Sequence, residues 1–373
     1  MKYRKLSFMI IFISVLLFVY LQPVFYPMNK KINSQSNTVK LKQPRPQQNT
    51  ENIVADLYAQ MIGQDIKAVR DKLPTELQKV DTGYGYTEYL FANQHQNYDV
   101  LTNHNGKIQE LTVFGSKGKV DNDFYLGMDL EDLLSKATVS SSLSLKLQDK
   151  DYQFELSEED MNYRPFISYN NQVYAICYFH PISGKLFAIR YLDAPYLLKV
   201  APYQIIKGQY DIYENESRLA NWEELSAQKA NYLLTLFSRL DEKKYQLADS
   251  DSDVVANKAL AQFEQNPEKV LSTARILQLK QMHTQRTEAF FTFTSDELKH
   301  LTDIAQLENA RGIFLSPSVD CMDITLQLQT NPILHNKLTN NQAKALSIAF
   351  HKQDMLVLIL DEEYNKGGIL CDY

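Results

Sequence analysis

Cysteine, tryptophan and metal-binding motifs are scarce in this sequence. Its 373 residues include a single tryptophan and three cysteines, Cys177, Cys321 and Cys371. No two cysteines have the CxxC spacing, which excludes the usual zinc site of paired cysteines. We therefore expect neither a metal nor a cofactor. Outside the cytoplasm Cys321 could pair with Cys371, although buried free thiols are the alternative that we favour.

Acidic residues are absent from the first fifty positions, which hold eight Lys/Arg. The remaining residues carry 31 Lys/Arg and 45 Asp/Glu, a net charge of −14. A net-acidic body repels phosphate backbones, so we expect no nucleic-acid partner. The content of 44% hydrophobic residues is that of a folded protein and excludes disorder over the whole chain.

The N-terminus has the pattern of a membrane anchor. Three cations, Lys2, Arg4 and Lys5, precede an apolar run from position 6 to 21. A cleaved secretory signal is the competing interpretation, but it requires small residues at its cleavage site, and bulky residues follow this run. We predict an uncleaved signal anchor, a transmembrane helix, over 1–28 and a basic polar linker over 29–50. The expected location is the cell membrane, as a single-pass protein with its body outside the cytoplasm.

An internal repeat opens the region 51–210. MIGQDIKAVRDKL (61–73) and YLGMDLEDLLSKA (125–137) share Gly-x-Asp followed by aliphatic residues at helical spacing. Asp65 and Asp129 are placed to cap short helices. Strands with alternating apolar residues follow each helix, and Asn105-Gly106 predicts a hairpin. We predict a duplicated helix-plus-antiparallel-sheet module, an α+β fold, with residues 158–160 in a solvated loop.

Helices dominate the region 215–373. Their predicted ranges are 222–240, 254–263, 267–283, 296–307 and 317–328. Ser316 is the expected N-cap of the last of these helices. A terminal hairpin of strands 343–350 and 355–360 follows, and MLVLIL in its second strand indicates burial on both faces.

This order of helices before a terminal antiparallel sheet resembles the CAP/SCP superfamily, the cysteine-rich secretory proteins and their bacterial relatives. ANYLLTLFSRL (230–240) is similar to the family's opening helix, and LENARGI (307–313) to its Gly-Glu-Asn-Ile motif. The duplicated module resembles the CAP-associated N-terminal domain of Gram-positive bacterial proteins. The resemblance implies a helix-rich, CAP-like α/β sandwich behind that module.

The resemblance also implies a cavity with two histidines and two acids, and this chain offers Glu308 and His335 at matching positions. Leu326 stands where the second acid would fall, and residues 290–294 contain no histidine where the first would fall. Two ligands of four do not hold a metal firmly. We therefore interpret the domain as degenerate, and Glu308 and His335 as a buried hydrogen-bonded pair.

The function that follows is a membrane-anchored, extracytoplasmic binding or scaffold protein of the cell envelope without catalytic activity. Its partners would be the membrane, through the N-terminal helix, and an envelope protein, a wall glycan or a lipid. The alternative is an envelope hydrolase or metal-dependent peptidase-like enzyme that uses Glu308 and His335 as its catalytic residues.

Overall fold

The structure is a computed structural model that describes residues 54–93, 96–120, 123–170, 172–208, 222–240, 253–284, 290–307, 311–339 and 345–360. The chain divides into two units, and all of these residues lie in the second, Pro46–Tyr373. The predicted anchor (1–28) and linker (29–50) lie outside the described residues, as does the boundary predicted near 210. Within the described ranges no helix is long and apolar enough to cross a membrane.

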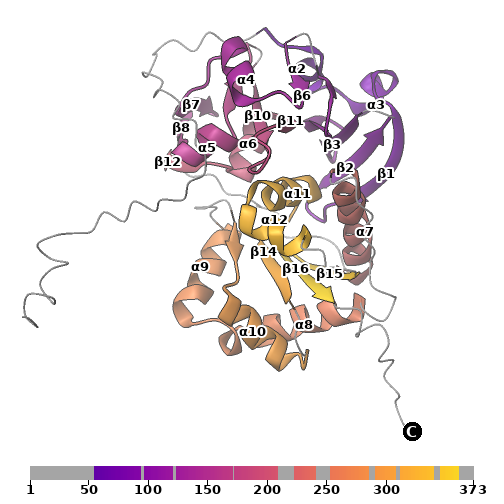
Figure 1. The fold of residues 1–373 in the computed structure, drawn as a ribbon, viewed down its shortest axis with the longest axis vertical. Coiled ribbons are helices and arrows are strands. Elements are labelled where there is room, and N and C mark those ends of the chain that lie inside the picture. Colours follow the sequence, from indigo (N-terminus) through magenta and orange to yellow (C-terminus); the bar gives the residue numbers. More distant parts are fainter. Residues whose placement is uncertain are drawn as a thin grey trace, which may run out of the picture. The chain divides into compact units, whose positions relative to one another are not determined.

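The N-terminal lobe, residues 54–208, is built on one seven-stranded antiparallel sheet (Figure 1). In spatial order its strands are β1 (Thr75–Asp81), β2 (Tyr86–Ala92), β3 (Asn97–Asn103), β4 (Ile108–Phe114), β11 (Leu186–Asp193), β10 (Val173–Phe179) and β9 (Phe166–Ser168). The two sequence repeats meet where β4 pairs with β11, with Thr112 opposite Arg190. The repeats therefore share one sheet, and their two hairpins lie side by side at its centre.

Capped short helices open each repeat, as the sequence predicts. Asp65 accepts a hydrogen bond from the Lys67 amide at 2.9 Å and starts α3 (Ile66–Val69), which follows α2 (Leu57–Met61) and leads into the 3-10 helix η1 (Arg70–Lys72). Asp129 caps α4 (Leu130–Lys136) through the Asp132 amide, also at 2.9 Å. Side chains from these helices, Val69 and Leu133 among them, pack in the core on one face of the sheet.

Smaller elements complete the N-terminal lobe. They are the sheet β12-β8-β7 (Gln204–Lys207, Lys150–Glu155, Ser142–Leu147), the pair β5 (Gly118–Lys119) and β6 (Tyr125–Leu126), and the helices α5 (Glu158–Tyr163) and α6 (Ala194–Val200). The solvated loop predicted at 158–160 is wrong. Ser157 and Asp160 form a capping box that starts α5, and Asp160 is buried in an ion pair with Arg164.

The C-terminal lobe, residues 222–360, is a three-layer sandwich around the four-stranded sheet β13-β14-β16-β15. Its elements are α7 (Trp222–Leu240), α8 (Asp253–Gln265), the 3-10 helix η2 (Pro267–Lys269), α9 (Thr273–Thr284), β13 (Phe291–Thr292), α10 (Ser295–Ile304), β14 (Arg311–Ser316), α11 (Cys321–Thr330), α12 (Pro332–Thr339), β15 (Ala345–His351) and β16 (Asp354–Leu360). Helices α8, α9 and α10 cover one face of the sheet, and α7, α11 and α12 cover the other. The mixed helix and sheet architecture agrees with the α/β sandwich that the sequence predicts.

Four features of the C-terminal lobe differ from the prediction. Strand β13, strand β14 and the separate helix α12 were not predicted. The helix predicted from 317 begins at Cys321, with Asp320 and not Ser316 as its N-cap. Ser316 instead pairs with Phe291 at the end of β14. The carbonyls of Ser318 and Val319 accept hydrogen bonds from the Lys229 ammonium, which holds this loop outside the helix.

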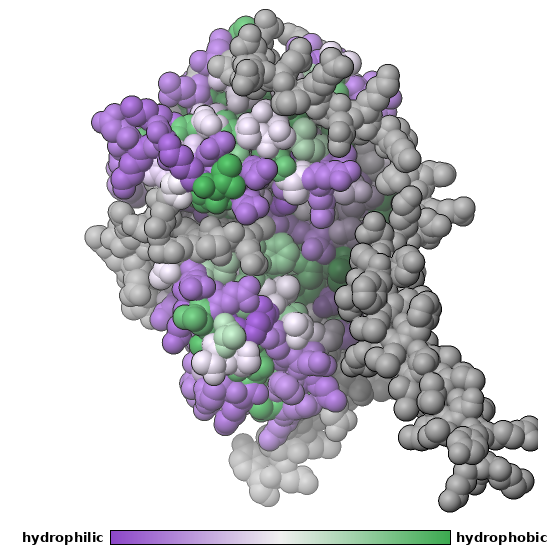
Figure 2. Space-filling view, turned by 90° about the vertical axis from the view of Figure 1, so that its left-hand side faces the viewer, coloured by the Kyte–Doolittle hydropathy of each residue, from purple (hydrophilic) through white to green (hydrophobic). Residues whose placement is uncertain are grey.

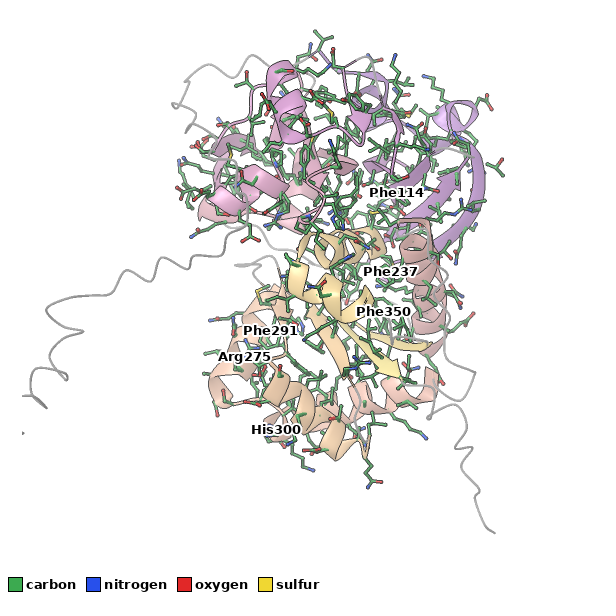
Figure 3. The ribbon with its side chains drawn as sticks, viewed as in Figure 1. Phe114, Phe237, Arg275, Phe291, His300 and Phe350 are labelled. Atoms are coloured by element: carbon green, nitrogen blue, oxygen red, sulfur yellow. The ribbon has the colours of Figure 1, made fainter. Side chains whose placement is uncertain are left out.

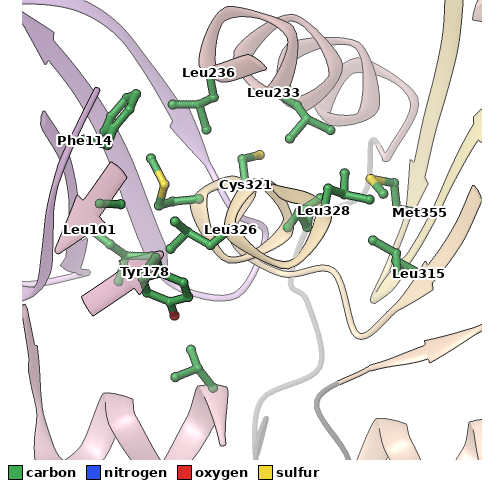
Figure 4. Close-up of a cluster of buried hydrophobic side chains, with 14 of the residues drawn as sticks. Leu101, Phe114, Tyr178, Leu233, Leu236, Leu315, Cys321, Leu326, Leu328 and Met355 are labelled. Atoms are coloured by element: carbon green, nitrogen blue, oxygen red, sulfur yellow. The ribbon is translucent and has the colours of Figure 1, made fainter. Parts of the chain in front are cut away.

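The lobes meet around α11, whose ten residues are all buried. Figure 4 shows Leu326 facing Leu101 and Tyr178 of the first sheet, while Leu328 faces Met355 of the second sheet. One hydrophobic cluster therefore continues from sheet to sheet. Its aromatic members Phe114, Phe237 and Phe350 follow this path across the junction (Figure 3).

The outer surface is mixed in character. On the face shown in Figure 2, hydrophilic side chains predominate and hydrophobic ones form small separate groups. Ile182 and Ile333 are the large apolar side chains exposed most after Val54, at 70% each. Scattered exposed apolar residues are normal, so the surface by itself indicates no ligand site.

Shortening Leu326 tests whether the junction stabilises the fold. We expect Leu326→Ala to lower the free energy of unfolding by about 2–5 kcal/mol, because the side chain is fully buried and its loss leaves a cavity. The matched control is Leu134→Ala on α4, where the side chain is 39% exposed and the expected change is within about 0.5 kcal/mol. Urea unfolding measures both variants, and equal effects would contradict this account of the junction.

Candidate functional site

One face of the seven-stranded sheet carries buried charges on neighbouring strands. Glu88 (β2), Asp99 (β3), Glu110 (β4) and Arg190 (β11) are all 0% exposed. The strand register places them on the same face, since Asp99 lies opposite Leu90 and Glu110 lies opposite Leu101. Charged groups are almost never fully buried unless they are paired, so this face requires partners.

The N-terminus of α11 supplies partners for the sheet. Glu88 Oε1 accepts hydrogen bonds from the amides of Cys321 at 2.7 Å and Met322 at 3.1 Å. The first amides of a helix have no intrahelical acceptor and lie at the positive end of its dipole. The side-chain carboxyl group of a residue in the N-terminal lobe therefore satisfies the start of a helix in the C-terminal lobe.

Arg190 joins acids from both lobes. Its guanidinium donates to Glu110 Oε2 at 2.7 Å, to Asp320 Oδ2 at 2.9 Å and to Asp323 Oδ1 at 2.6 Å. Tyr196 from α6 also donates to Asp320 Oδ2. The planar fork of an arginine suits several carboxylates at once, which a lysine could not match.

Helix α7 contributes the second buried cation and a phenol. Lys229 is 0% exposed, and besides the two loop carbonyls its ammonium lies 4.5 Å from the centre of the Phe350 ring. Tyr232 donates a hydrogen bond to Asp99 Oδ2. We refer to the group of buried charges as the interlock, and it comprises Glu88, Asp99, Glu110, Arg190, Lys229, Asp320 and Asp323.

The interlock contains five carboxyl groups and two cations, so it favours bound protons. Burial, with the nearby Asp320, raises the pKa of Glu88 to about 8, although the two α11 amides oppose the shift. Burial also raises the pKa of Glu110 to about 7, against the influence of Arg190. The pKa of Asp99 lies well above its usual range, through burial and then through Glu88. Each shift has the same physical cause, since a dry site disfavours the charged form.

The sequence analysis missed the interlock, although a signal was present. A charged residue stands at an interior position of each of four largely apolar strands: YTEYLFA, NYDVLTN, IQELTVF and LFAIRYLD. Charges at interior positions of adjacent strands predict a buried polar network, provided that the strand order is known. That order depends on the pairing of β4 with β11, which no local pattern encodes.

A cleft of about 1080 Å³ lies in the C-terminal lobe. Residues of α10 and of α12 form its two walls, and the start of β14 with Ile359 of β16 lies between them. Its charged lining groups are Lys299, Arg311, Lys337 and Asp303. Its volume is typical of a pocket for a small ligand or a short peptide segment, and its charge favours anions.

Of the two residues that the family resemblance suggests, Glu308 and His335, the structure describes only His335. Glu308 lies outside the described residues, while its neighbours Leu307 and Arg311 line the cleft. His335 is buried on α12, and its ring lies 5.1 Å from that of His180 in the N-terminal lobe. The pairing of Glu308 with His335 stays a prediction.

A serine, a histidine and an aspartate do meet elsewhere, but without the geometry of a catalytic triad. His283 Nε2 lies 2.9 Å from Ser316 Oγ and 2.8 Å from Asp354 Oδ1. A triad uses one ring nitrogen for the serine and the other for the aspartate, whereas both contacts here use the same nitrogen. His300 is exposed on α10 (Figure 3).

The sequence analysis favours buried free thiols over a disulfide between Cys321 and Cys371. Cys321 is a buried free thiol at the start of α11. Cys371, the partner considered in the sequence analysis, lies outside the described residues. Within the described ranges, no group of three or more His, Cys, Asp or Glu side chains is placed to hold a metal ion.

The comparisons with known proteins agree with this architecture. Residues 62–203 match the CAP-associated N-terminal domain. The CAP-associated N-terminal domain that the sequence resemblance predicts is therefore confirmed, and the match includes the strands that carry Glu88, Asp99, Glu110 and Arg190. The uncharacterized membrane protein YlbC of Bacillus subtilis (strain 168) is 26% identical over 133 residues, which cover 35% of this chain and only 38% of the relative.

Two solved structures share the fold of both lobes. A cysteine-rich secretory protein from Staphylococcus aureus subsp. aureus Mu50 has a TM-score of 0.59 and 18% identity, over 84% of this chain and 98% of that one. An extracellular protein containing an SCP domain from Bacillus anthracis str. Ames has a TM-score of 0.60 and 18% identity, over 86% of this chain and 99% of that one. The predicted order, a CAP-associated domain before a CAP/SCP-like domain, is confirmed at the level of the fold.

The raised carboxyl pKa values predict how stability depends on pH. An acid with a higher pKa in the folded chain than in the unfolded chain holds more protons when folded, so unfolding becomes easier as pH rises between the two values. For Glu88 this window runs from 4.5 to about 8. We expect the free energy of unfolding to fall across that window, and Glu88→Gln to make the decline shallower.

Glu88→Gln should also raise the free energy of unfolding above pH 8 by at least about 1 kcal/mol, since one pKa unit corresponds to about 1.4 kcal/mol. A glutamine oxygen can still accept the two α11 amides, so the contact itself is retained. Urea unfolding over a pH series measures the slope, with Glu131→Gln on the exposed side of α4 as the matched control. The same slope in Glu88→Gln as in the wild type would show that Glu88 does not take up the proton.

Proposed function

We propose that this protein is a membrane-tethered, extracytoplasmic binding protein of the cell envelope, with the cleft between α10 and α12 as its ligand site. The apolar run at 6–21 would form the tether, as the sequence analysis expects. The Bacillus subtilis relative is named a membrane protein, and the Bacillus anthracis neighbour an extracellular one. Both descriptions support this location.

The observation that carries the proposal is the charge of the cleft. Among the described residues that line the opening of about 1080 Å³, the charged ones are Lys299, Arg311, Lys337 and Asp303. The body of the chain has a net charge of −14, so a local excess of cations stands out against its surroundings. Such a concentration raises the local concentration of anions and orients them on approach.

The interlock fixes the position of α11, the helix that precedes one wall of the cleft. Through α11 it joins the C-terminal lobe to the sheet of the CAP-associated domain, and the two share one hydrophobic cluster. Helix α12, one wall of the cleft, follows α11 after Asn331 alone. A ligand site on a rigid element loses less conformational entropy on binding than one on a loop.

A cysteine placed in the cleft tests both the location and the binding. Asn336 is exposed on α12 and lines the cleft. In a chain whose Cys371 is changed to serine, Asn336→Cys would be treated in intact cells with a membrane-impermeant maleimide that carries a benzophenone. We expect labelling from outside, followed on illumination by a cross-linked adduct, because the probe then lies beside the bound ligand.

The matched control is Lys280→Cys, at an exposed position of α9 away from the cleft. It should label equally and give little adduct on illumination. Labelling only after the cells are lysed would contradict the extracytoplasmic location. Equal labelling with no more adduct at position 336 than at 280 would contradict binding in the cleft.

A further inference from the structure

Strand β16 leads the chain out of the sheet at the cleft. Its residue Ile359 lines the cleft and pairs with Arg311, which lines the cleft too. Leu360 ends β16, and residues 361–373 follow it in the sequence. An extended residue adds about 3.3 Å, so the first three of these residues span about 10 Å and all of them about 40 Å. The segment 361–373 therefore begins beside the cleft and has the length to cross it.

Each wall of the cleft presents a lysine. Lys299 is exposed on α10, and Lys337 is half-buried on α12. Neither lysine has an ion-pair partner within the described part of the chain, whereas Arg311 already has a partner. The described lining also includes the carboxylate of Asp303. Ammonium groups on both walls of one cleft favour negative charge placed between them.

Acidic residues open the segment that follows β16. Asp361, Glu362 and Glu363 come directly after the last residue of the strand. Over the whole of 361–373, four acids and Lys366 give a net charge of −3. Opposite charges attract over about 8–10 Å at physiological ionic strength, a distance that the first residues of the segment span. A neighbouring segment of the same chain thus supplies the charge that the lysines of the cleft favour.

The second half of the segment is apolar, and the cleft contains an exposed apolar residue. Ile369 and Leu370 follow the pair Gly367-Gly368, whose lack of side chains lets the chain turn. In the cleft, Ile333 on α12 is 70% exposed, which leaves most of a large aliphatic side chain in water. Contact between these aliphatic groups removes apolar surface from water and stabilises the same arrangement as the charges do.

We propose that residues 361–373 occupy the cleft in the ligand-free protein, with 361–363 between Lys299 and Lys337, and that a ligand must displace them. This inference rests on the proposed binding function and names how that site is regulated. A segment on the same chain has an effective concentration of about millimolar, whereas a free anion or a second copy must bind from dilute solution. A few weak contacts are therefore sufficient to fill the cleft, and they set the affinity that a ligand has to exceed.

The test is a cross-link within the purified, full-length protein in detergent, with no ligand added. Asn336→Cys, in the chain with Cys371→Ser, would be labelled with the benzophenone maleimide, illuminated, digested and analysed by mass spectrometry. We expect position 336 to be joined to a peptide from 361–373 of the same chain, because the probe then lies beside the segment. Lys280→Cys on α9, which does not line the cleft, should give at least about fivefold less of this product, since the charges of the cleft hold the segment elsewhere.

Charge reversal tests the contacts that hold the segment. Lys299→Glu combined with Lys337→Glu should lower the yield of the internal cross-link at least about fivefold, because like charges then face each other. The yield should return when the same chain also carries Asp361→Lys, Glu362→Lys and Glu363→Lys. A misfolded cleft would not regain the cross-link in this way, so the rescue separates lost contacts from lost structure. Far-UV circular dichroism checks the fold of each variant.

Three results would overturn the inference: a yield at position 336 no higher than at 280, a cross-link that joins two copies of the chain, or a yield that charge reversal leaves unchanged. The experiment in cells then separates the two claims. Removing 361–373 should raise the adduct with other molecules at position 336 at least about threefold, because the ligand no longer competes with the segment. The same adduct with and without the segment would keep the binding function and discard its regulation. No such adduct in either chain would remove the function, and the regulation with it.

Discussion

The contact between Glu88 and the start of α11 is the constraint on which the arrangement of the lobes depends. Two helix amides, those of Cys321 and Met322, find their acceptor on a strand of the other lobe, more than two hundred residues earlier in the chain. Arg190 adds a second connection through Asp320 and Asp323. Removing one partner from such a buried group leaves an uncompensated charge or polar group, so the lobes are held in one relative position.

Local patterns in the sequence were sufficient for much of the fold. The capping aspartates Asp65 and Asp129, the hairpin at Asn105-Gly106 and the long helix α7 follow from spacing and residue type. Strand β14 was missed because its short run lies next to a proline and reads equally well as the start of a helix. The interlock was missed for a different reason, since its members are brought together by strand order and not by proximity in sequence.

The cleft, like the interlock, is formed by residues that are far apart in the sequence. Its three cations lie on α10, β14 and α12, and no motif links them. The family resemblance directed attention to Glu308 and His335, of which His335 packs against His180 on the side of α12 away from the cleft-lining residues.

Native-state hydrogen exchange of the Cys321 and Met322 amides tests most directly whether the two lobes form one unit joined by the interlock. If they do, these amides exchange only through global unfolding, with the same opening free energy as the amides of β4 and β11 at the centre of the CAP-associated domain. Exchange of Cys321 and Met322 at a clearly lower free energy than those strands would mean that α11 separates from the sheet on its own, and would contradict the account.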